Sequence, residues 1–392
     1  MLRSTVDEDL YKLVNASLDE HQPILHHCEF DATDGRQGHT SAARSCSGRE
    51  NLALTTVNAD TTWLLQIPRP RFDPSPRVYY NIILDPWLSG PQSDLASWFS
   101  RQWHAISSAY ETVPEVEELC RRVEAIASSK PMASIAADES VIDAIAISHE
   151  FTDHCHKDTL VQFGRDVPVI ATAKAAELIR GWGHFERVVE TPPFGGDNAA
   201  EDGGGGGDGA DWRRTRIDAL PRWLGISRVV TGQDAFYYHS AVLLAFQLDP
   251  DKAAQCVIYT PHGIRANSLE PITTARPPLQ TLAMLHGLHD VRIDWGQQLN
   301  LGAHNGLMAQ RALRARYWLG THDEVKKGGG IVSWFLRRKV WSVADALDQA
   351  EDEEGKGLFG GEYLELGNGQ SLVLSMEGAE EVDEVNGVED EL

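Results

Sequence analysis

Short apolar runs alternate with amphipathic stretches in the first half of the chain. Runs of strand length lie at residues 61–67, 79–85, 141–148 and 168–173, and each contains β-branched or aromatic residues. The last run continues directly into the amphipathic pattern of residues 173–182, which predicts a helix. Short buried strands that alternate with helices are typical of an α/β architecture.

The second half of the chain repeats this series. The pattern predicts strands at 240–248, 255–260 and 316–322, and helices at 277–288, 303–315 and 330–349. Each strand-rich half must cover its apolar surface, and helices of its own can cover the outer side. We therefore predict an α/β fold, a four-layered αββα sandwich, with the functional loops at the seam where the strands end.

Three segments fall outside this pattern. Residues 1–50 form an N-terminal extension with one helical stretch at 7–20, and we expect it to be partly flexible. Residues 195–211 are rich in glycine and aspartate, which predicts a disordered insertion within a domain that spans 51–348. The segment 349–392 ends in many carboxylates without lysine or arginine, so like-charge repulsion predicts a largely flexible tail.

The charge balance narrows the classes of partner. A formal net charge of −23 repels nucleic-acid phosphates and anionic membrane surfaces, so we expect a small-molecule substrate and no nucleic acid. No run approaches the roughly 20 apolar residues that a membrane-spanning helix needs. The five cysteines include no CxxC pair, which fits a reducing compartment and favours a cytoplasmic protein. The sequence does not indicate an oligomeric state.

Histidines gather at the ends of the predicted strands. They are His149, His154 and His156 after 141–148, His239 before 240–248, His262 after 255–260, and His322 within 316–322. Loops at strand ends can present side chains to a shared crevice while the sheet holds the backbone still. Neutral imidazole and carboxylate are ligands that suit zinc, iron and manganese, so this pattern predicts a metal site.

The segment ISHEFTDHCH at residues 147–156 resembles the His-x-His-x-Asp-His signature of the metallo-β-lactamase superfamily. NIILDPWLSGP at 81–91 is similar to a strand and turn found earlier in that fold. The branch it resembles most contains N-acyl-phosphatidylethanolamine phospholipase D and L-ascorbate-6-phosphate lactonase. The similarity covers roughly residues 55 to 345 without the insertion. It implies an αββα sandwich of the metallo-β-lactamase type, with metal ligands at His149, Asp153, His154 and His322.

Two departures from the signature change the expected metal content. Phe151 stands where the second histidine belongs, and His262 stands near the place of the aspartate that bridges two metals. An imidazole gives one nitrogen to one metal, whereas a carboxylate can bridge two, so the resemblance implies one divalent metal. We expect zinc, with iron or manganese as alternatives. The expected ligands are Asp153, His154, His262 and His322, with His149 and His239 completing the shell or lining the pocket.

A metal with an open coordination position lowers the pKa of bound water to about 7. The leading interpretation is therefore a hydrolase that attacks an ester, lactone or phosphodiester with metal-bound hydroxide. Asp153 would orient or deprotonate the water, and His156 or His304 would protonate the leaving group. One alternative is a catalytically silent relative that keeps a structural metal or a ligand-binding pocket, and a second is a mononuclear iron redox enzyme.

Two further features have ordinary structural interpretations. His286 and His289 are three residues apart, and we place both at a helix C-terminus, where imidazolium is favoured. Cys155 lies between two histidines, and we interpret it as a small buried residue rather than a ligand or nucleophile.

Overall fold

The computed structural model describes residues 51–93, 100–131, 140–195, 210–231, 238–294, 297–329, 334–354 and 361–376. The helix predicted at 7–20 and nearly all of the insertion predicted at 195–211 lie outside these ranges. Within them, every helix is too short or too polar to cross a membrane.

The first sheet has seven strands, in the order β18-β1-β2-β3-β5-β6-β7. Their bounds are Leu52–Thr56 (β1), Trp63–Pro68 (β2), Tyr79–Leu84 (β3), Ala144–Ile147 (β5), Val169–Ala171 (β6), Val188–Glu190 (β7) and Ser371–Leu374 (β18). Strands β3, β5, β6 and β7 run parallel, so their carboxyl ends share one edge of the sheet. The four strands predicted in the first half of the sequence are confirmed as β2, β3, β5 and β6.

The second sheet has six strands, in the order β17-β14-β11-β10-β9-β8. Their bounds are Leu224–Val230 (β8), Ser240–Phe246 (β9), Ala254–Thr260 (β10), Leu279–His286 (β11), Tyr317–Leu319 (β14) and Glu362–Leu364 (β17). Strands β10, β11, β14 and β17 are parallel to one another. This arrangement brings the carboxyl ends of β10 and β14 to the same edge.

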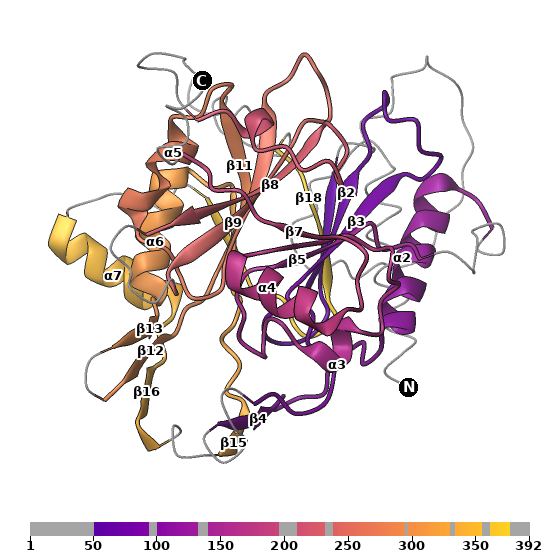
Figure 1. The fold of residues 1–392 in the computed structure, drawn as a ribbon. Helices are drawn as coiled ribbons and strands as arrows, with labels where there is room; N and C mark the ends of the chain where they lie inside the picture. Colours follow the sequence, from indigo (N-terminus) through magenta and orange to yellow (C-terminus); the bar gives the residue numbers. More distant parts are fainter. Residues whose placement is uncertain are drawn as a thin grey trace, which may run out of the picture.

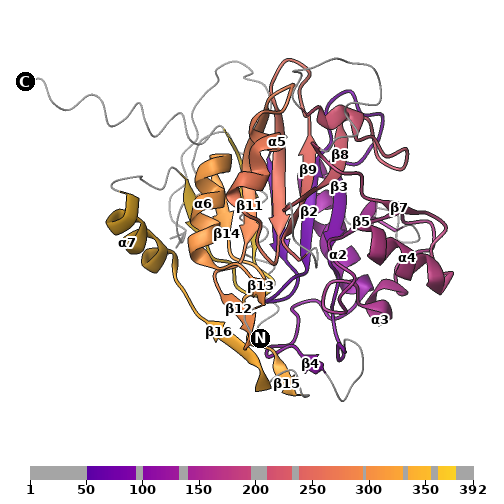
Figure 2. The same cartoon turned by 60° about the vertical axis from the view of Figure 1, so that its left-hand side comes forward.

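Helices cover the outer face of each sheet (Figures 1 and 2). On the first sheet they are α2 (Val113–Ser128), α3 (Lys157–Leu160) and α4 (Ala173–Trp182), and on the second α5 (Glu270–Thr273), α6 (Ala303–Leu313) and α7 (Val343–Glu354). The buried apolar residues divide into three clusters, one under each helical layer and one between the sheets. The predicted four-layered αββα sandwich is therefore confirmed.

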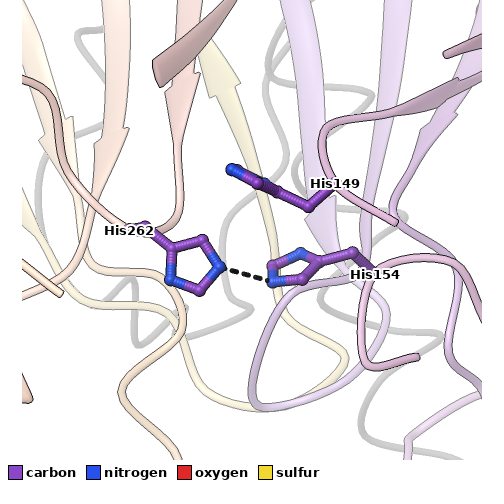
Figure 3. A group of neighbouring side chains, drawn as sticks. All are labelled: His149, His154 and His262. Carbon is purple, nitrogen blue, oxygen red and sulfur yellow. Dashed lines mark hydrogen bonds between the residues drawn. The ribbon is translucent and has the colours of Figure 1, made fainter. Parts of the chain in front are cut away.

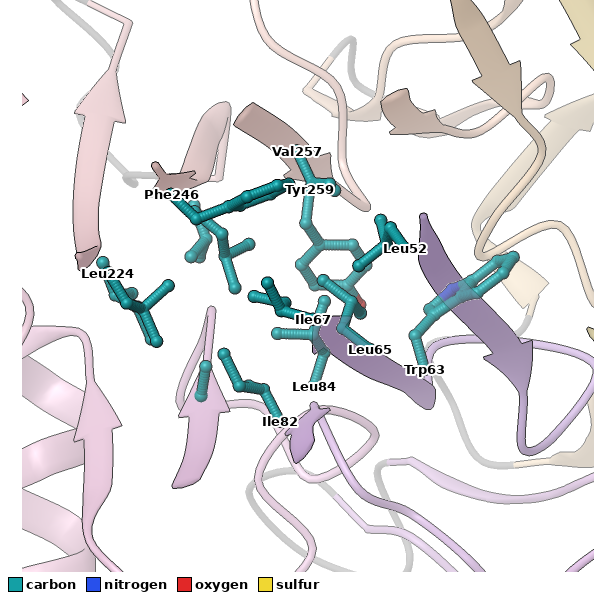
Figure 4. Packing of buried hydrophobic residues seen from close by; sticks show 14 of the residues in the cluster. Leu52, Trp63, Leu65, Ile67, Ile82, Leu84, Leu224, Phe246, Val257 and Tyr259 are labelled. Atoms are coloured by element: carbon teal, nitrogen blue, oxygen red, sulfur yellow. The ribbon is translucent and has the colours of Figure 1, made fainter. Parts of the chain in front are cut away.

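Strand β3 shows why the runs are almost continuously apolar. Tyr79 and Ile83 belong to the cluster under the helices, whereas Ile82 and Leu84 belong to the cluster between the sheets. A strand buried on both faces needs apolar side chains at nearly every position, and the exception in β3, Asn81, donates to the Val141 carbonyl oxygen and accepts from Gln66. In the central cluster the first sheet meets residues of the second such as Phe246 (Figure 4). Each such side chain contributes about 1.5–3 kcal/mol when it is fully buried.

Two small sheets lie beside the main ones. One has the order β13-β12-β16, with bounds Asp290–Ile293 (β12), Gln298–Asn300 (β13) and Leu336–Lys339 (β16). The other pairs β15 (Lys327–Gly329) with β4 (Arg101–Trp103). Short 3₁₀ turns at Trp212–Arg214 (η3) and Ala266–Leu269 (η4) complete the described elements. Both small sheets lie below the main sandwich in Figure 1.

Several predicted elements are wrong. The helix predicted at 277–288 is strand β11, which lies between parallel strands β10 and β14 and is therefore apolar on both faces. Of the helix predicted at 330–349, residues 343–349 are confirmed as part of α7, whereas residues 336–339 form strand β16. Beyond the domain end drawn at 348, strands β17 and β18 pair within the two main sheets, so the domain extends further than its composition suggested.

Helix α2 was not predicted, although its start carries a sequence signal. Thr112 caps the helix through its side chain, which accepts from the backbone N–H of Glu115, and the Glu115 side chain accepts from the Thr112 backbone. This reciprocal pair is a capping box, and it satisfies two backbone donors that a helix start leaves without partners. The pattern of threonine followed three residues later by glutamate was present in the sequence.

Candidate metal centre

The loops that follow four parallel strands converge at one end of the sandwich. Asp85 follows β3, the segment 149–154 follows β5, His262 follows β10, and His322 follows β14. A fifth contribution comes from Asp60 in the connection between β1 and β2. The described structure thus brings together five of the predicted ligands from both sheets, namely His149, Asp153, His154, His262 and His322.

Two imidazoles face each other at the centre of this cluster (Figure 3). The Nε2 atoms of His154 and His262 are 3.0 Å apart. His154 Nδ1 lies 2.7 Å from Asp85 Oδ2, and His262 Nδ1 lies 2.8 Å from Asn300 Oδ1. Both acceptors call for a proton on Nδ1, which leaves each Nε2 to present a lone pair when the ring is neutral. Two nitrogens that ligate one tetrahedral zinc at about 2.0–2.1 Å would lie about 3.3 Å apart, close to the observed spacing.

His149 adds a third imidazole to this pair. Its ring centroid is 4.6 Å from that of His262 and 5.2 Å from that of His154. The three residues each offer a ligand atom, and these atoms lie within 4.8 Å of one another. His149 Nε2 lies 3.0 Å from the carbonyl oxygen of Tyr238, and Nδ1 lies 2.9 Å from Ser148 Oγ. We refer to His149, His154 and His262 as the histidine group.

A second set of possible ligands shares His154. It consists of Asp153, His154 and His322, whose ligand atoms also lie within 4.8 Å of one another. His154 Nε2 is 3.7 Å from Asp153 Oδ1, and His322 Nε2 is 3.9 Å from Asp153 Oδ2. His322 Nδ1 lies 3.1 Å from Asp60 Oδ1, so this imidazole too has its Nδ1 against an oxygen acceptor. We refer to this set as the aspartate group.

Burial and neighbouring charges set the protonation of these side chains. Burial lowers the pKa of both His149 and His262 well below the usual value, and the neighbouring imidazoles lower it further. Both rings are therefore neutral at pH 7. His262 keeps its lone pair on Nε2, whereas His149, whose Nε2 faces the Tyr238 carbonyl oxygen, keeps it on Nδ1. Burial also lowers the pKa of His154, but the carboxylates of Asp153 and Asp85 more than offset this and raise it. For Asp153, burial raises the pKa, and the nearby Lys326 reverses the effect and lowers it well below normal.

Three predicted site residues lie elsewhere in the described structure. His156 Nδ1 contacts Thr159 Oγ1 at 3.0 Å and its Nε2 lies 3.3 Å from the Pro91 carbonyl oxygen. His304 sits in helix α6 with its ring 4.4 Å from that of Trp341. His239 is buried just before β9 and belongs to neither group of possible ligands among the described residues. His156 and His304 also belong to neither group, and their role in protonating a leaving group stays a prediction.

His286, His289 and Cys155 were predicted to have structural roles, and the positions predicted for the two histidines are wrong. His286 is not at a helix C-terminus but at the end of β11, where it is buried and its Nε2 lies 2.9 Å from Asn305 Oδ1. His289 follows in the connection to β12 and contacts Arg338. Cys155 is buried, and burial raises the pKa of its thiol, which is consistent with a structural role.

Phe151 packs beside the cluster rather than away from it. The Phe151 ring stacks on the rings of Tyr238 and His149, with distances between ring centroids of 5.3 and 6.0 Å. The centroid of the His262 ring is 6.1 Å away. The phenyl ring therefore forms an apolar wall on the side of the histidine group.

Four residues of the site were missed from the sequence: Asp60, Asp85, Asn300 and Lys326. Asp85 had the clearest signal, because it is the aspartate of the DPWLSG turn that carries the family resemblance. Its φ of 41° is left-handed, a conformation that short polar residues tolerate better than bulky ones. Asp60 and Lys326 lie in loops and Asn300 ends strand β13, all far along the chain from their partners, and spacing alone does not reveal them.

No family model and no curated protein matches this chain. Among solved structures, a possible metal-dependent hydrolase from Veillonella parvula is similar, with 8% identity, a TM-score of 0.47, and coverage of 82% of this chain and 99% of that chain. An isothiocyanate hydrolase from Delia radicum gut bacteria shows 13% identity, a TM-score of 0.47 and the same coverage of 82% and 99%. The metallo-beta-lactamase fold protein YhfI from Bacillus subtilis shows 10% identity and a TM-score of 0.42, covering 82% and 99%.

Proposed function

We propose that this protein is a metal-dependent hydrolase of an ester, lactone or phosphodiester. The observation that carries the proposal is the pair of Nε2 atoms of His154 and His262, 3.0 Å apart, each on a ring whose Nδ1 lies against an oxygen acceptor. Metal-ligating histidines in proteins commonly donate their second N–H to a carboxylate or carbonyl oxygen, which fixes the tautomer and the ring orientation.

The donor set fits a divalent metal. Zinc, iron and manganese accept imidazole nitrogen, and the buried rings of His149 and His262 are held neutral. Three protein nitrogens leave one of zinc's four positions for water or substrate, which is the composition of catalytic rather than structural zinc sites. We propose one zinc ion as the cofactor. When bound, such an ion polarises a carbonyl or phosphoryl oxygen and makes water acidic enough to yield a nucleophile near neutral pH.

The chain's own residues supply the remaining steps. Asp153 faces the cluster, with Oδ1 3.7 Å from His154 Nε2, so its ionised carboxylate can accept a hydrogen bond from a nucleophilic water and orient it. The stacked rings of Phe151 and Tyr238 close one side of the histidine group with apolar surface. Such a wall excludes water and strengthens the electrostatic interactions at the reacting bond.

The motifs HEFTDH and DPWLSG support membership of the metallo-β-lactamase superfamily, near the branch of N-acyl-phosphatidylethanolamine phospholipase D and L-ascorbate-6-phosphate lactonase. The net charge of −23 supports a small-molecule substrate over a nucleic acid. Cysteines 120, 155 and 256 are buried and unpaired by disulfides, which supports a cytoplasmic location.

The test is a turnover screen of the purified protein with aryl esters, lactones and an aryl phosphodiester. We expect hydrolysis that a chelator abolishes and added zinc restores. His154→Ala and Asp153→Ala should each lose turnover. The matched variant His184→Ala should retain it, because this histidine directly follows the C-cap of helix α4 and contacts the Phe163 carbonyl oxygen. Hydrolysis that survives complete removal of metal, or no hydrolysis of any of the three bond types by the zinc-loaded protein, overturns the proposed function.

A further inference from the structure

Lys326 lies between two carboxylates beside the cluster. Its Nζ is 2.6 Å from Asp153 Oδ2 and 2.8 Å from Asp60 Oδ2. The Lys326 side chain is 7% exposed, and Nζ also lies 5.4 Å from the centroid of the Trp87 ring. Removing an ammonium from water is costly, so a buried lysine requires close partners of opposite charge. Here two aspartates provide them, and the three charges form one buried unit.

The loop that carries this ammonium is fixed on both sides of it. Before it, the backbone N–H of His322 donates to the Asp60 carbonyl oxygen at 2.9 Å, and Glu324 accepts two backbone hydrogen bonds from the segment after β4. Directly after it, Lys327 begins strand β15, which pairs with β4. The position of the Lys326 side chain is therefore set by the fold.

The histidine group and the aspartate group cannot both be complete. Both need His154, and its Nδ1 lies against Asp85, so one nitrogen, Nε2, remains for a cation. A neutral imidazole nitrogen has one lone pair and binds one ion. The sequence and the spacing alone leave the choice between the two groups open.

The position of Lys326 decides between them. The oxygen of Asp153 that faces His322, Oδ2, is the same oxygen that contacts Lys326 Nζ. A divalent ion in the aspartate group would have to share the Asp153 carboxylate with this fixed ammonium, even if it bound the other oxygen, Oδ1, which faces His154. Two cations on one carboxylate repel each other. The hydrogen-bond partners of His149 and His262 are Ser148, the Tyr238 carbonyl oxygen, Asn300 and His154. The positive charge of Arg228 also acts on His149, but among the described residues no ammonium lies against a ligand atom of these two rings as Lys326 does against Asp153.

We propose that the Lys326 ammonium acts as a permanent second cation of this centre, which holds the Asp153 carboxylate and leaves one exchangeable metal ion to His149, His154 and His262. The inference rests on the proposed metal-dependent function and deepens it. Asp153 and His322, both expected ligands from the sequence, then stand outside the ligand set. Lys326 is a positioning residue, since it acts through Asp153 rather than on substrate.

Metal content measured by elemental analysis after dialysis tests the ligand set without recourse to turnover. Wild type should retain one equivalent of zinc. His149→Gln should lose it, and His322→Gln should keep it, because these two residues distinguish the groups. Loss of zinc in His322→Gln with retention in His149→Gln, or two equivalents in wild type, overturns the proposal.

Lys326→Met tests the role of the ammonium itself. Without the ammonium, Asp60 Oδ2, Asp153 Oδ2 and His322 Nε2 remain around the vacated position, and none of these atoms requires His154. This variant should therefore bind a second equivalent of zinc there and gain thermal stability on its addition. Lys327→Met removes the same charge from the next residue, which is exposed, and should behave as wild type. A Lys326→Met protein that stays at one equivalent overturns the proposal. If that variant does not fold, Asp153→Asn replaces it: retention of one equivalent supports the proposal, and loss of the ion overturns it.

The same measurements separate this inference from the proposed function. A protein that holds one ion through the histidine group but hydrolyses none of the tested bonds overturns the hydrolase proposal and leaves the role of Lys326 intact. A zinc-dependent hydrolase whose ion is lost with His322 overturns the role of Lys326 alone. A wild-type protein that binds no zinc overturns both.

Discussion

Asp85→Asn perturbs the cluster without replacing a proposed metal ligand. Asp85 Oδ1 accepts from the backbone N–H of Ser148 at 2.7 Å, and Oδ2 lies 2.7 Å from His154 Nδ1 and 2.8 Å from the Tyr259 hydroxyl. An asparagine keeps one oxygen and puts an NH₂ group in place of the other. If the NH₂ takes the Oδ2 position, it faces His154 Nδ1 and favours the tautomer that carries its proton on Nε2. That tautomer cannot bind the metal.

The opposite orientation of the amide is no better. The NH₂ group would then face the Ser148 backbone N–H, two donors would meet in a buried place, and the unsatisfied group would cost about 1–3 kcal/mol. Loss of a partner that orients a metal-bound histidine typically lowers metal affinity 10–100-fold. Since tenfold corresponds to about 1.4 kcal/mol, the two estimates agree, and we expect zinc affinity to fall by about 10–100-fold.

Competition with a zinc chelator measures this affinity in the folded variant. Tyr259→Phe is the matched control, because it removes a different donor to the same carboxylate and leaves the contact between Asp85 and His154 in place. Its zinc affinity should stay close to that of wild type. An Asp85→Asn protein that binds zinc as tightly as wild type would refute the reasoning that Asp85 fixes the tautomer of His154.

Two further predictions concern stability, both measured by denaturant unfolding. Gly306→Ala should destabilise the protein by about 1–3 kcal/mol, because the Cβ of the new alanine would overlap the buried Trp318 ring. Gly181→Ala in helix α4 is the control: its Cβ meets open space, and it should stabilise the protein by about 0.5–1 kcal/mol. Equal effects at the two positions would contradict the packing described for α6. In metal-free protein, burial raises the pKa of Asp60 and Asp153, but Lys326 more than offsets it and both are lowered. These ionised carboxylates stabilise the folded state at any pH above about 4, the pKa of an aspartate in the unfolded chain. This stabilisation is lost as the pH falls below that value toward the lower pKa of the folded state. The free energy of unfolding should therefore fall from pH 6 to pH 3, and fall less in Lys326→Met; equal slopes would contradict the role of the lysine.

The layering of the fold was predictable because burial on both faces leaves a direct trace in the sequence. Strand β3 reads as YYNIIL, and the αββα arrangement follows from two such series with their helices. The same trace is ambiguous for a run such as LQTLAMLH, where apolar residues fit a helix as well as a strand, and parallel pairing with β10 and β14 makes it β11. That pairing is a tertiary fact, which local pattern does not contain.

The candidate site could likewise be predicted only in part from the sequence. His149, Asp153 and His154 lie within one short segment, and their relation to one another is visible in the motif. The partners that orient the histidines are Asp85, Asn300 and Asp60, which lie 69, 38 and 262 positions from theirs. Lys326 lies 173 positions from Asp153, in a chain whose acids greatly outnumber its bases, so the sequence gives no reason to single it out. Only the three-dimensional structure shows which charged side chains contact one another.

The central claim is that imidazoles from both halves of the sandwich hold one metal ion. A crystal grown with zinc and measured at the zinc absorption edge tests it most directly, through the anomalous-scattering map. We expect a single peak about 2.0–2.1 Å from the Nε2 atoms of His154 and His262, with His149 as the third ligand. A map with no peak among these three histidines would contradict the account.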